Sequence, residues 1–92
     1  MRIIPTGPPE ENQFESIDDF KWCMHCHGEV EFEWHGKIYW FAHPDGRMWV
    51  YEAYKPETEQ VRDTADELLD CEIDGEKLRD IITKIHVLDR TI

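Results

Sequence analysis

The sequence predicts a single α+β domain with an N-terminal helix, a three-stranded antiparallel β-meander, two short C-terminal helices and a terminal extended segment. Three observations support this prediction. From position 29 to 34, glutamates alternate with apolar residues, which is the period of a half-buried strand. Two turn signals, His35-Gly36 and Pro44-Asp45-Gly46, then divide the following apolar run into two hairpins. Apolar residues at helical spacing occur before and after this region.

The N-terminal part of the chain is expected to form an arm and then a helix. Residues 1–13 are rich in proline, glycine and polar side chains, so we expect a flexible arm there and one domain over 14–92. Ser16 can act as the N-cap of a helix, because its hydroxyl can accept a hydrogen bond from the first turn. Apolar residues then continue at helical spacing up to Gly28, which is suited to end the helix.

Loop length determines how the three strands pair. A two-residue loop at the first turn places Phe32 opposite Tyr39, and a three-residue loop at the second turn places Phe41 opposite Trp49. One face then forms the core and carries Val30, Phe32, Trp34, Tyr39, Phe41, Trp49 and Tyr51. The other face carries apolar Ile38, Trp40, Met48 and Val50 with acidic Glu29, Glu31, Glu33 and Glu52 around them. A slip of one residue in either loop would exchange the two faces of the affected strand.

The C-terminal part predicts two short helices and a strand. Thr64 and Glu67 have the spacing of a capping box, which favours a short helix from that point, although one longer helix from about Glu59 keeps the same apolar spacing. Asp74-Gly75 is expected to start the second helix. Residues 86–88 are expected to form a terminal strand or an extended tail.

Two stretches of the sequence match a pattern seen in other proteins. The first is an acidic-apolar strand followed by the turn Gly36-Lys37-Ile38-Tyr39, and the second runs from Glu67-Leu68-Leu69 into Ile73-Asp74-Gly75-Glu76-Lys77-Leu78. Over residues 14–88 the chain resembles a loose group of small uncharacterised intracellular proteins from Gram-positive bacteria. The resemblance implies a small α+β domain and no known activity, so it assigns no functional residue.

The charge of the chain limits the partners that it can bind. Asp and Glu number 21 against 10 Lys and Arg, which gives a formal net charge of -11. Such a chain repels phosphate, so we expect neither nucleic acid nor an anionic membrane as a partner. No apolar run approaches the ~20 residues of a membrane span, and the first residues lack the pattern of a secretory signal. An odd number of cysteines also fits reduced thiols, so the expected location is the cytoplasm.

One cluster has residues that could bind a metal. Cys23-x-x-Cys26 has the spacing of a thiolate pair on one ion, and His27 could add an imidazole, so we consider a zinc site on Cys23, Cys26 and His27. The cluster also matches the C-x-x-C-H haem-attachment signature, but that signature belongs to exported proteins. A thioredoxin-like role is not expected, because the pair lies near a helix C-terminus. The sequence has no Ser-His-Asp context, nucleophile elbow, phosphate-binding loop or dinucleotide-binding fingerprint, so we expect a protein that is not an enzyme.

The predicted second face of the meander is the preferred functional region. An apolar centre with an acidic margin is the anatomy of a protein interface, although another helix of the same chain could cover it. We therefore expect an interaction module that binds a protein partner or forms a homodimer, a description that includes inhibitors of the immunity or antitoxin type. The contact patch would comprise Ile38, Trp40, Met48 and Val50, with Glu31, Glu33 and Glu52 supplying charge. A zinc-binding protein is the rival hypothesis.

Overall fold

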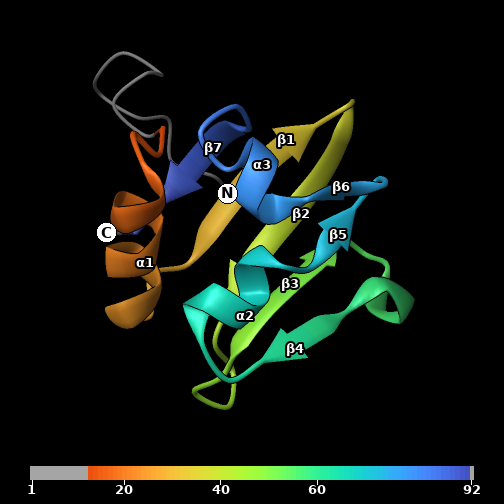
Figure 1. Ribbon diagram of the computed structural model, residues 1–92. Helices are drawn as coiled ribbons and strands as arrows, with labels where there is room; N and C mark the ends of the chain where they lie inside the picture. Colours follow the sequence, from red (N-terminus) through yellow and green to blue (C-terminus); the bar gives the residue numbers. More distant parts are fainter. Residues whose placement is uncertain (1–12, 92) are drawn as a thin grey trace.

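The computed structural model of the protein describes residues 13–91 (Figure 1). The large sheet contains β1 (Val30–Trp34), β2 (Lys37–Ala42), β3 (Met48–Glu52), β4 (Gln60–Arg62) and β7 (His86–Arg90). A small sheet contains β5 (Glu72–Ile73) and β6 (Glu76–Lys77). The helices are α1 (Ile17–His25), α2 (Ala65–Leu69) and α3 (Leu78–Ile81), and η2 (Pro56–Thr58) is a 3-10 turn. The arm expected over residues 1–13 lies outside the described residues except for Gln13.

The chain is an α+β protein, but the predicted three-stranded meander is wrong. The large sheet has five strands in the order β4-β3-β2-β1-β7, and each neighbouring pair is antiparallel. Strand β4 adds to one edge of the predicted meander, and β7 adds to the other (Figure 1). Both extra strands are short, and β7 pairs with a strand more than fifty residues earlier in the chain, so their pairing leaves no local pattern in the sequence.

The first hairpin is formed as predicted, and the second is shifted by one residue. Phe32 lies opposite Tyr39, and the turn residues His35 and Gly36 both have positive φ, as a two-residue type I′ loop requires. In the second hairpin, however, Phe41 lies opposite Val50 instead of Trp49. The predicted faces of β3 are therefore exchanged.

The reason for the shift is the side chain of Asp45. Its carboxylate accepts a hydrogen bond from the Arg47 backbone N–H at 3.0 Å and one from the Trp49 indole at 2.8 Å. Because Arg47 bonds to this side chain and not to the opposite strand, it joins the loop, which then spans four residues from Pro44 to Arg47 between His43 and Met48.

Asp74-Gly75 is a turn and not the predicted start of a helix. Both residues have positive φ, 52° and 82°, and they close the two-residue hairpin between β5 and β6. Helix α3 begins three residues later, at Leu78. The tip of this hairpin contacts the tip of the first one, where His35 Nδ1 lies 2.6 Å from an Asp74 carboxylate oxygen and Lys37 Nζ lies 3.2 Å from the other. The hydrogen bonds from His35 and Lys37 lower the pKa of Asp74.

The helices cover one face of the large sheet, which we call the inner face. Their buried side chains pack with those of the sheet in one core. The sheet contributes Val30, Phe32, Tyr39, Phe41, Met48, Val50 and Val87, and the helices and their flanks contribute Phe14, Phe20, Cys23, Met24, Leu68, Leu69, Leu78, Ile81, Ile82 and Ile85. The predicted N-caps are confirmed, since Ser16 accepts from the Asp19 N–H and Thr64 from the Glu67 N–H.

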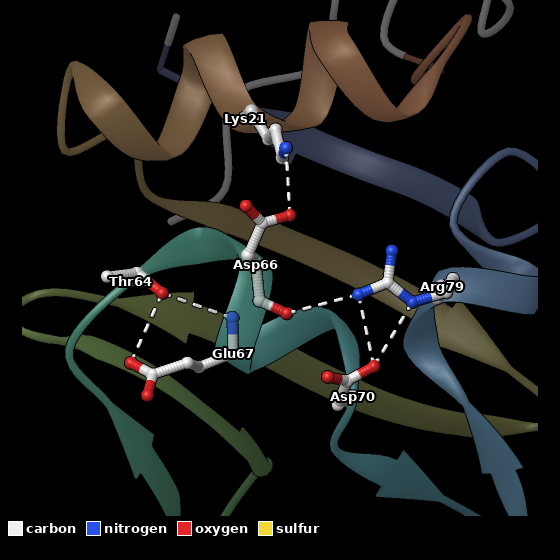
Figure 2. A network of polar contacts seen from close by, with 6 residues as sticks. All are labelled: Lys21, Thr64, Asp66, Glu67, Asp70 and Arg79. Atoms are coloured by element: carbon white, nitrogen blue, oxygen red, sulfur yellow. Dashed lines mark hydrogen bonds and ion pairs between the residues drawn. The ribbon is translucent and has the colours of Figure 1, made fainter.

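A polar network joins the three helices above the core (Figure 2). Lys21 of α1 points toward α2 and forms an ion pair with Asp66 at 2.8 Å. Arg79 of α3 reaches α2 from the other side, where its guanidinium donates to the Asp66 carbonyl and, at 3.0 Å, to the Asp70 carboxylate. The hydrogen bond from Lys21 lowers the pKa of Asp66. Two ion pairs of the same chain, Lys21–Asp66 and Arg79–Asp70, therefore tie α1 and α3 to α2.

The edge strand β7 is protected by residues that precede α1. The Gln13 side-chain amide donates to the Val87 carbonyl at 3.1 Å and accepts from the Val87 N–H at 3.0 Å. Arg90 lies over the Phe14 ring and pairs with Asp19 at 3.3 Å. Partial burial opposes ionisation of Asp19, but the hydrogen bonds from Arg90 and from the Glu15 N–H lower its pKa overall. These contacts satisfy backbone groups that an unprotected edge would offer to another strand.

Candidate functional site

The face of the large sheet opposite the helices is the candidate site, and we call it the outer face. Its members are half-buried side chains that alternate with the core residues along the strands: Glu31, Glu33, Ile38, Trp40, Ala42, Trp49, Tyr51, Val61 and Asp89. Among residues 13–91, no helix packs on this face, since the buried side chains of all three helices belong to the core on the inner side. The described helices therefore leave the aromatic and acidic groups of this face uncovered.

Strand pairing places four of these groups in a row across the sheet, which we call the central row. Asp89 of β7 lies opposite Glu31 of β1, Glu31 lies opposite Trp40 of β2, and Trp40 lies opposite Tyr51 of β3. Residues that face each other in antiparallel strands have neighbouring side chains on the same face. The central row therefore has an acidic half next to an aromatic half.

Hydrogen bonds hold both outer-face tryptophans in place. The Trp40 indole N–H donates to a Glu31 carboxylate oxygen at 3.1 Å, and the Trp49 indole N–H donates to Asp45 at 2.8 Å. Tyr51 packs edge-to-face on Trp40, with ring centroids 5.7 Å apart and an interplanar angle of 82°. Rings that are already fixed lose little conformational entropy when a partner binds.

Two hollows flank Trp40. The first, of about 380 Å³, runs along the central row and is lined by Glu29, Glu31, Trp40, Tyr51, Asp89 and Thr91, among others. The second, of about 320 Å³, lies on the other side of Trp40, where the exposed Tyr54 ring packs edge-to-face on the indole at 5.5 Å. Each hollow has the size of a small ligand site or a side-chain pocket.

The electrostatic field on the outer face is negative. Partial burial raises the pKa of Tyr51, and the nearby carboxylates of Glu59 and Glu29 raise it further. At the second turn, the Arg47 N–H and the Trp49 indole lower the pKa of Asp45 to about 2, and this carboxylate also forms an ion pair with the Arg47 guanidinium at 3.0 Å. The effect of Glu59 and Glu29 on Tyr51 indicates a local field that favours positive charge.

The structure brings only part of the predicted contact patch together on one face. Ile38, Trp40, Glu31 and Glu33 lie on the outer face, but Met48, Val50 and Glu52 do not. The one-residue shift of β3 turns Val50 and Met48 into the core, where Val50 is 0% and Met48 is 9% exposed. The same shift places Glu52 opposite the buried Tyr39, where it pairs with Lys55 at 3.0 Å.

Trp49 and Tyr51 take the place of those residues, and both were missed because they were assigned to the core. The signal that could have revealed them is Asp45 at the second turn. An aspartate can accept a hydrogen bond from the N–H two residues later, which lengthens the loop by one residue and inverts the next strand.

The predicted metal ligands are not assembled into a site. Cys23 is fully buried in the core, and burial raises the pKa of its thiol, which opposes the thiolate that zinc needs. Cys26 is half-buried at the end of α1, and the exposed His27 stacks on His43 with centroids 5.0 Å apart. Within the described part of the chain, no three His, Cys, Asp or Glu side chains are grouped so that they could hold an ion.

No family model, curated protein or solved structure matches this chain. The resemblance to small proteins of Gram-positive bacteria therefore stays a prediction. None of the helices over residues 13–91 has the length and apolar character that crossing a membrane requires.

Proposed function

We propose that this chain is a small non-enzymatic interaction module of the cytoplasm, which binds a basic protein through its outer face. The observation that carries the proposal is the central row, in which two carboxylates and two aromatic rings lie side by side on a sheet face that the helices leave open. Aromatic residues are enriched at the centres of protein interfaces, where they contribute most of the binding energy.

The charge of the face favours a basic protein over the alternatives. In a homodimer formed through this face, the carboxylates of one copy would meet those of the other, and like charges at an interface cost several kcal/mol. Nucleic acids and anionic membranes would meet the same repulsion. A partner with a basic surface gains both a faster encounter and complementary contacts. An inhibitor of the immunity or antitoxin type, which covers a basic surface of its target, meets this description.

A selection with random peptides tests the proposal. Immobilised wild-type protein is exposed to a display library of 12-residue peptides, and binders are counter-selected on the double variant Trp40→Ser/Trp49→Ser. The matched control is Trp22→Ser, because Trp22 is 60% exposed but lies on α1, away from the outer face. We expect the selected peptides to be rich in Lys and Arg and to bind wild type and the control variant alike.

Loss of binding in the double variant, with an unchanged circular dichroism spectrum, is the supporting result. Two results would contradict the proposal: selected peptides without an excess of basic residues, or peptides that bind the double variant as well as the wild type. A second copy of the chain as the true partner would appear as a dimer in sedimentation analysis, which the double variant would abolish.

A further inference from the structure

We infer that a further hollow, on the inner side of the large sheet, binds a linear aliphatic diamine through an ammonium group at each end of the molecule. We call it the intersheet hollow, because β2, β3 and β4 line it on one side and β5 of the small sheet lines it on the other. Its volume is about 350 Å³, which is in the range of small-ligand sites. The inference goes beyond the proposed function, since it concerns a small molecule and a different surface.

Acidic groups line the intersheet hollow over its whole length. Two contacts join β5 and its turn to the large sheet at different positions: the Gln60 side chain donates to the Glu72 carbonyl at 2.8 Å, and Lys37 pairs with Asp74 at 3.2 Å. Lys37 is the single basic residue of the described lining. The carboxylates of the lining are Glu52, Glu57, Glu59, Glu72 and Asp74. A hollow lined by one sign of charge concentrates ions of the opposite sign.

The chain itself neutralises only part of this charge. Glu52 pairs with Lys55 at 3.0 Å, and Asp74 is bound by His35 and Lys37. Three carboxylates of the lining have no ion pair or hydrogen bond with any residue that the structure describes: Glu57, Glu59 and Glu72. The hollow therefore keeps an excess of negative charge after every internal pair has formed.

A buried tyrosine is a second and independent sign of a bound group. Tyr39 is only 4% exposed, and its ring stacks on Phe32 with centroids 5.3 Å apart. Tyr39 lines the hollow, and its hydroxyl has no hydrogen-bond partner within residues 13–91. Burial raises the pKa of Tyr39, and the carboxylates of Glu52 and Asp74 raise it further, so the hydroxyl stays neutral. A neutral hydroxyl can accept a hydrogen bond from an ammonium N–H, which would satisfy this buried group.

The floor of the intersheet hollow is apolar. The buried side chains of Val50 and Ile73 line it together with the Tyr39 ring. An aliphatic chain packs on such a surface while its charged end reaches polar groups. An ammonium is a compact charge with three N–H donors, which suits a site made of one hydroxyl and several carboxylates.

These features give the diamine a definite position. Glu52 and Asp74 both act on the Tyr39 hydroxyl, so one ammonium would lie at this end of the hollow. Glu72 lies at the other end, where Gln60 joins β4 to β5, and the second ammonium would lie there. The aliphatic chain between the two charges would then cover the apolar floor. A single charge or an uncharged chain would use only part of the site.

The test is a titration of ¹⁵N-labelled protein with 1,5-diaminopentane at low salt, followed by backbone amide spectra. Two probes of the same length are controls: 1-aminopentane, which has one charge, and 1,5-pentanediol, which has none. We expect the diamine to shift the amide signals of Gln60, Glu72 and Ile73 in a saturable way and to leave the Trp40 indole signal unchanged. It should bind about tenfold more tightly than 1-aminopentane, and the diol should not bind.

Two variants locate the diamine in the intersheet hollow. Tyr39→Phe removes the hydroxyl and keeps the ring, and Glu72→Gln removes the charge of an exposed side chain. We expect each to weaken the binding of 1,5-diaminopentane about tenfold. Glu15→Gln is the matched control, because Glu15 is an exposed glutamate before α1 and does not line the hollow, so it should change nothing. The amide spectrum of each variant without ligand shows that it is folded.

Three results would overturn the inference. The first is equal affinity for 1,5-diaminopentane and 1-aminopentane, and the second is unchanged affinity in both Tyr39→Phe and Glu72→Gln. The third is the same set of shifts from magnesium chloride at equal concentration, because any dication would then suffice. Since Glu72 is exposed, Glu72→Gln alone decides the matter if Tyr39→Phe does not fold. None of these results bears on the binding of basic peptides by the outer face.

Discussion

The charged side chains on the two faces of the large sheet have different surroundings. On the helical side, the basic groups of Lys21 and Arg79 meet acidic groups of the same chain at about hydrogen-bond distance, and the network closes over an apolar core (Figure 2). On the outer face, Glu31 and Asp89 lie together beside two aromatic rings. The comparison teaches that ion pairs between helices join the covered side of the sheet, while on the open face two carboxylates of neighbouring strands lie beside aromatic rings, an arrangement that suits a partner of positive charge.

The largest difference in stability is expected between substitutions at two neighbouring positions of β3 whose side chains point to opposite faces of the sheet. Val50→Asp places an unpaired carboxylate in the core, which costs several kcal/mol and so removes much of the stability of a small domain. Trp49→Ser changes the outer face, so it should leave the domain folded. Thermal unfolding followed by circular dichroism distinguishes the two variants. Equal loss of stability in both would show that β3 is buried on both sides.

A smaller effect is expected on the helical side from the N-cap of α2. Thr64→Ala removes the acceptor for the Glu67 N–H, so we expect the free energy of unfolding to fall by about 1 kcal/mol. Thr64→Ser should restore most of the loss. Thr83→Ala, in the exposed turn after α3, is the control and should be neutral. Urea titration measures all three, and a neutral Thr64→Ala would mean that the cap adds nothing to the folded state.

Removing a charge from the outer face should increase the stability of the fold instead of lowering it. Asp89→Asn relieves the repulsion from Glu31, so we expect the free energy of unfolding to rise by about 0.2–1 kcal/mol while peptide binding weakens. A binding site often trades stability for function in this way. If Asp89→Asn lowers the stability in urea titration, the two carboxylates do not repel each other in the free protein.

The smallest effect is expected when low pH protonates Asp45 and weakens the loop of the second hairpin. Because the pKa of Asp45 is lowered to about 2 in the folded state, its bonds to Arg47 and Trp49 stabilise the loop above the ordinary pKa of 3.8. This contribution is lost as the pH falls from 3.8 through about 2. The indole N–H signal of Trp49 should therefore titrate with a midpoint near pH 2, and it should not titrate in Asp45→Asn. A midpoint near 4 would show that the indole bond is absent in solution.

Features that depend on residues close together in the sequence could be predicted. The caps at Ser16 and Thr64 and the His35-Gly36 turn involve groups at most three positions apart, and the structure confirms them. The outer positions of β1 and β2 followed from the same local pattern, so Glu31 and Trp40 were placed on the correct face.

Features that depend on a single side-chain bond or on distant pairing could not be predicted. The Asp45 carboxylate bonds to the Arg47 N–H within the second loop, whose length determines the face on which Trp49 and Tyr51 lie. Strand β7 brings Asp89 to Glu31 from a distant part of the chain. The sequence therefore predicted the outer positions of Glu31 and Trp40. The positions of Tyr51 and Asp89 in the central row depend on the register of β3 and on the pairing of β7.

Hydroxyl-radical footprinting of the free protein, with mass-spectrometric detection, tests the central claim of an open outer face most directly. Met48 and Trp49 are adjacent and both are reactive, but only Trp49 is on the outer face. We predict rapid oxidation of Trp40, Trp49 and Tyr51, together with slow oxidation of Met48. Rapid oxidation of Met48 with protection of Trp49 would contradict the register of β3, and protection of all four would mean that the outer face is covered.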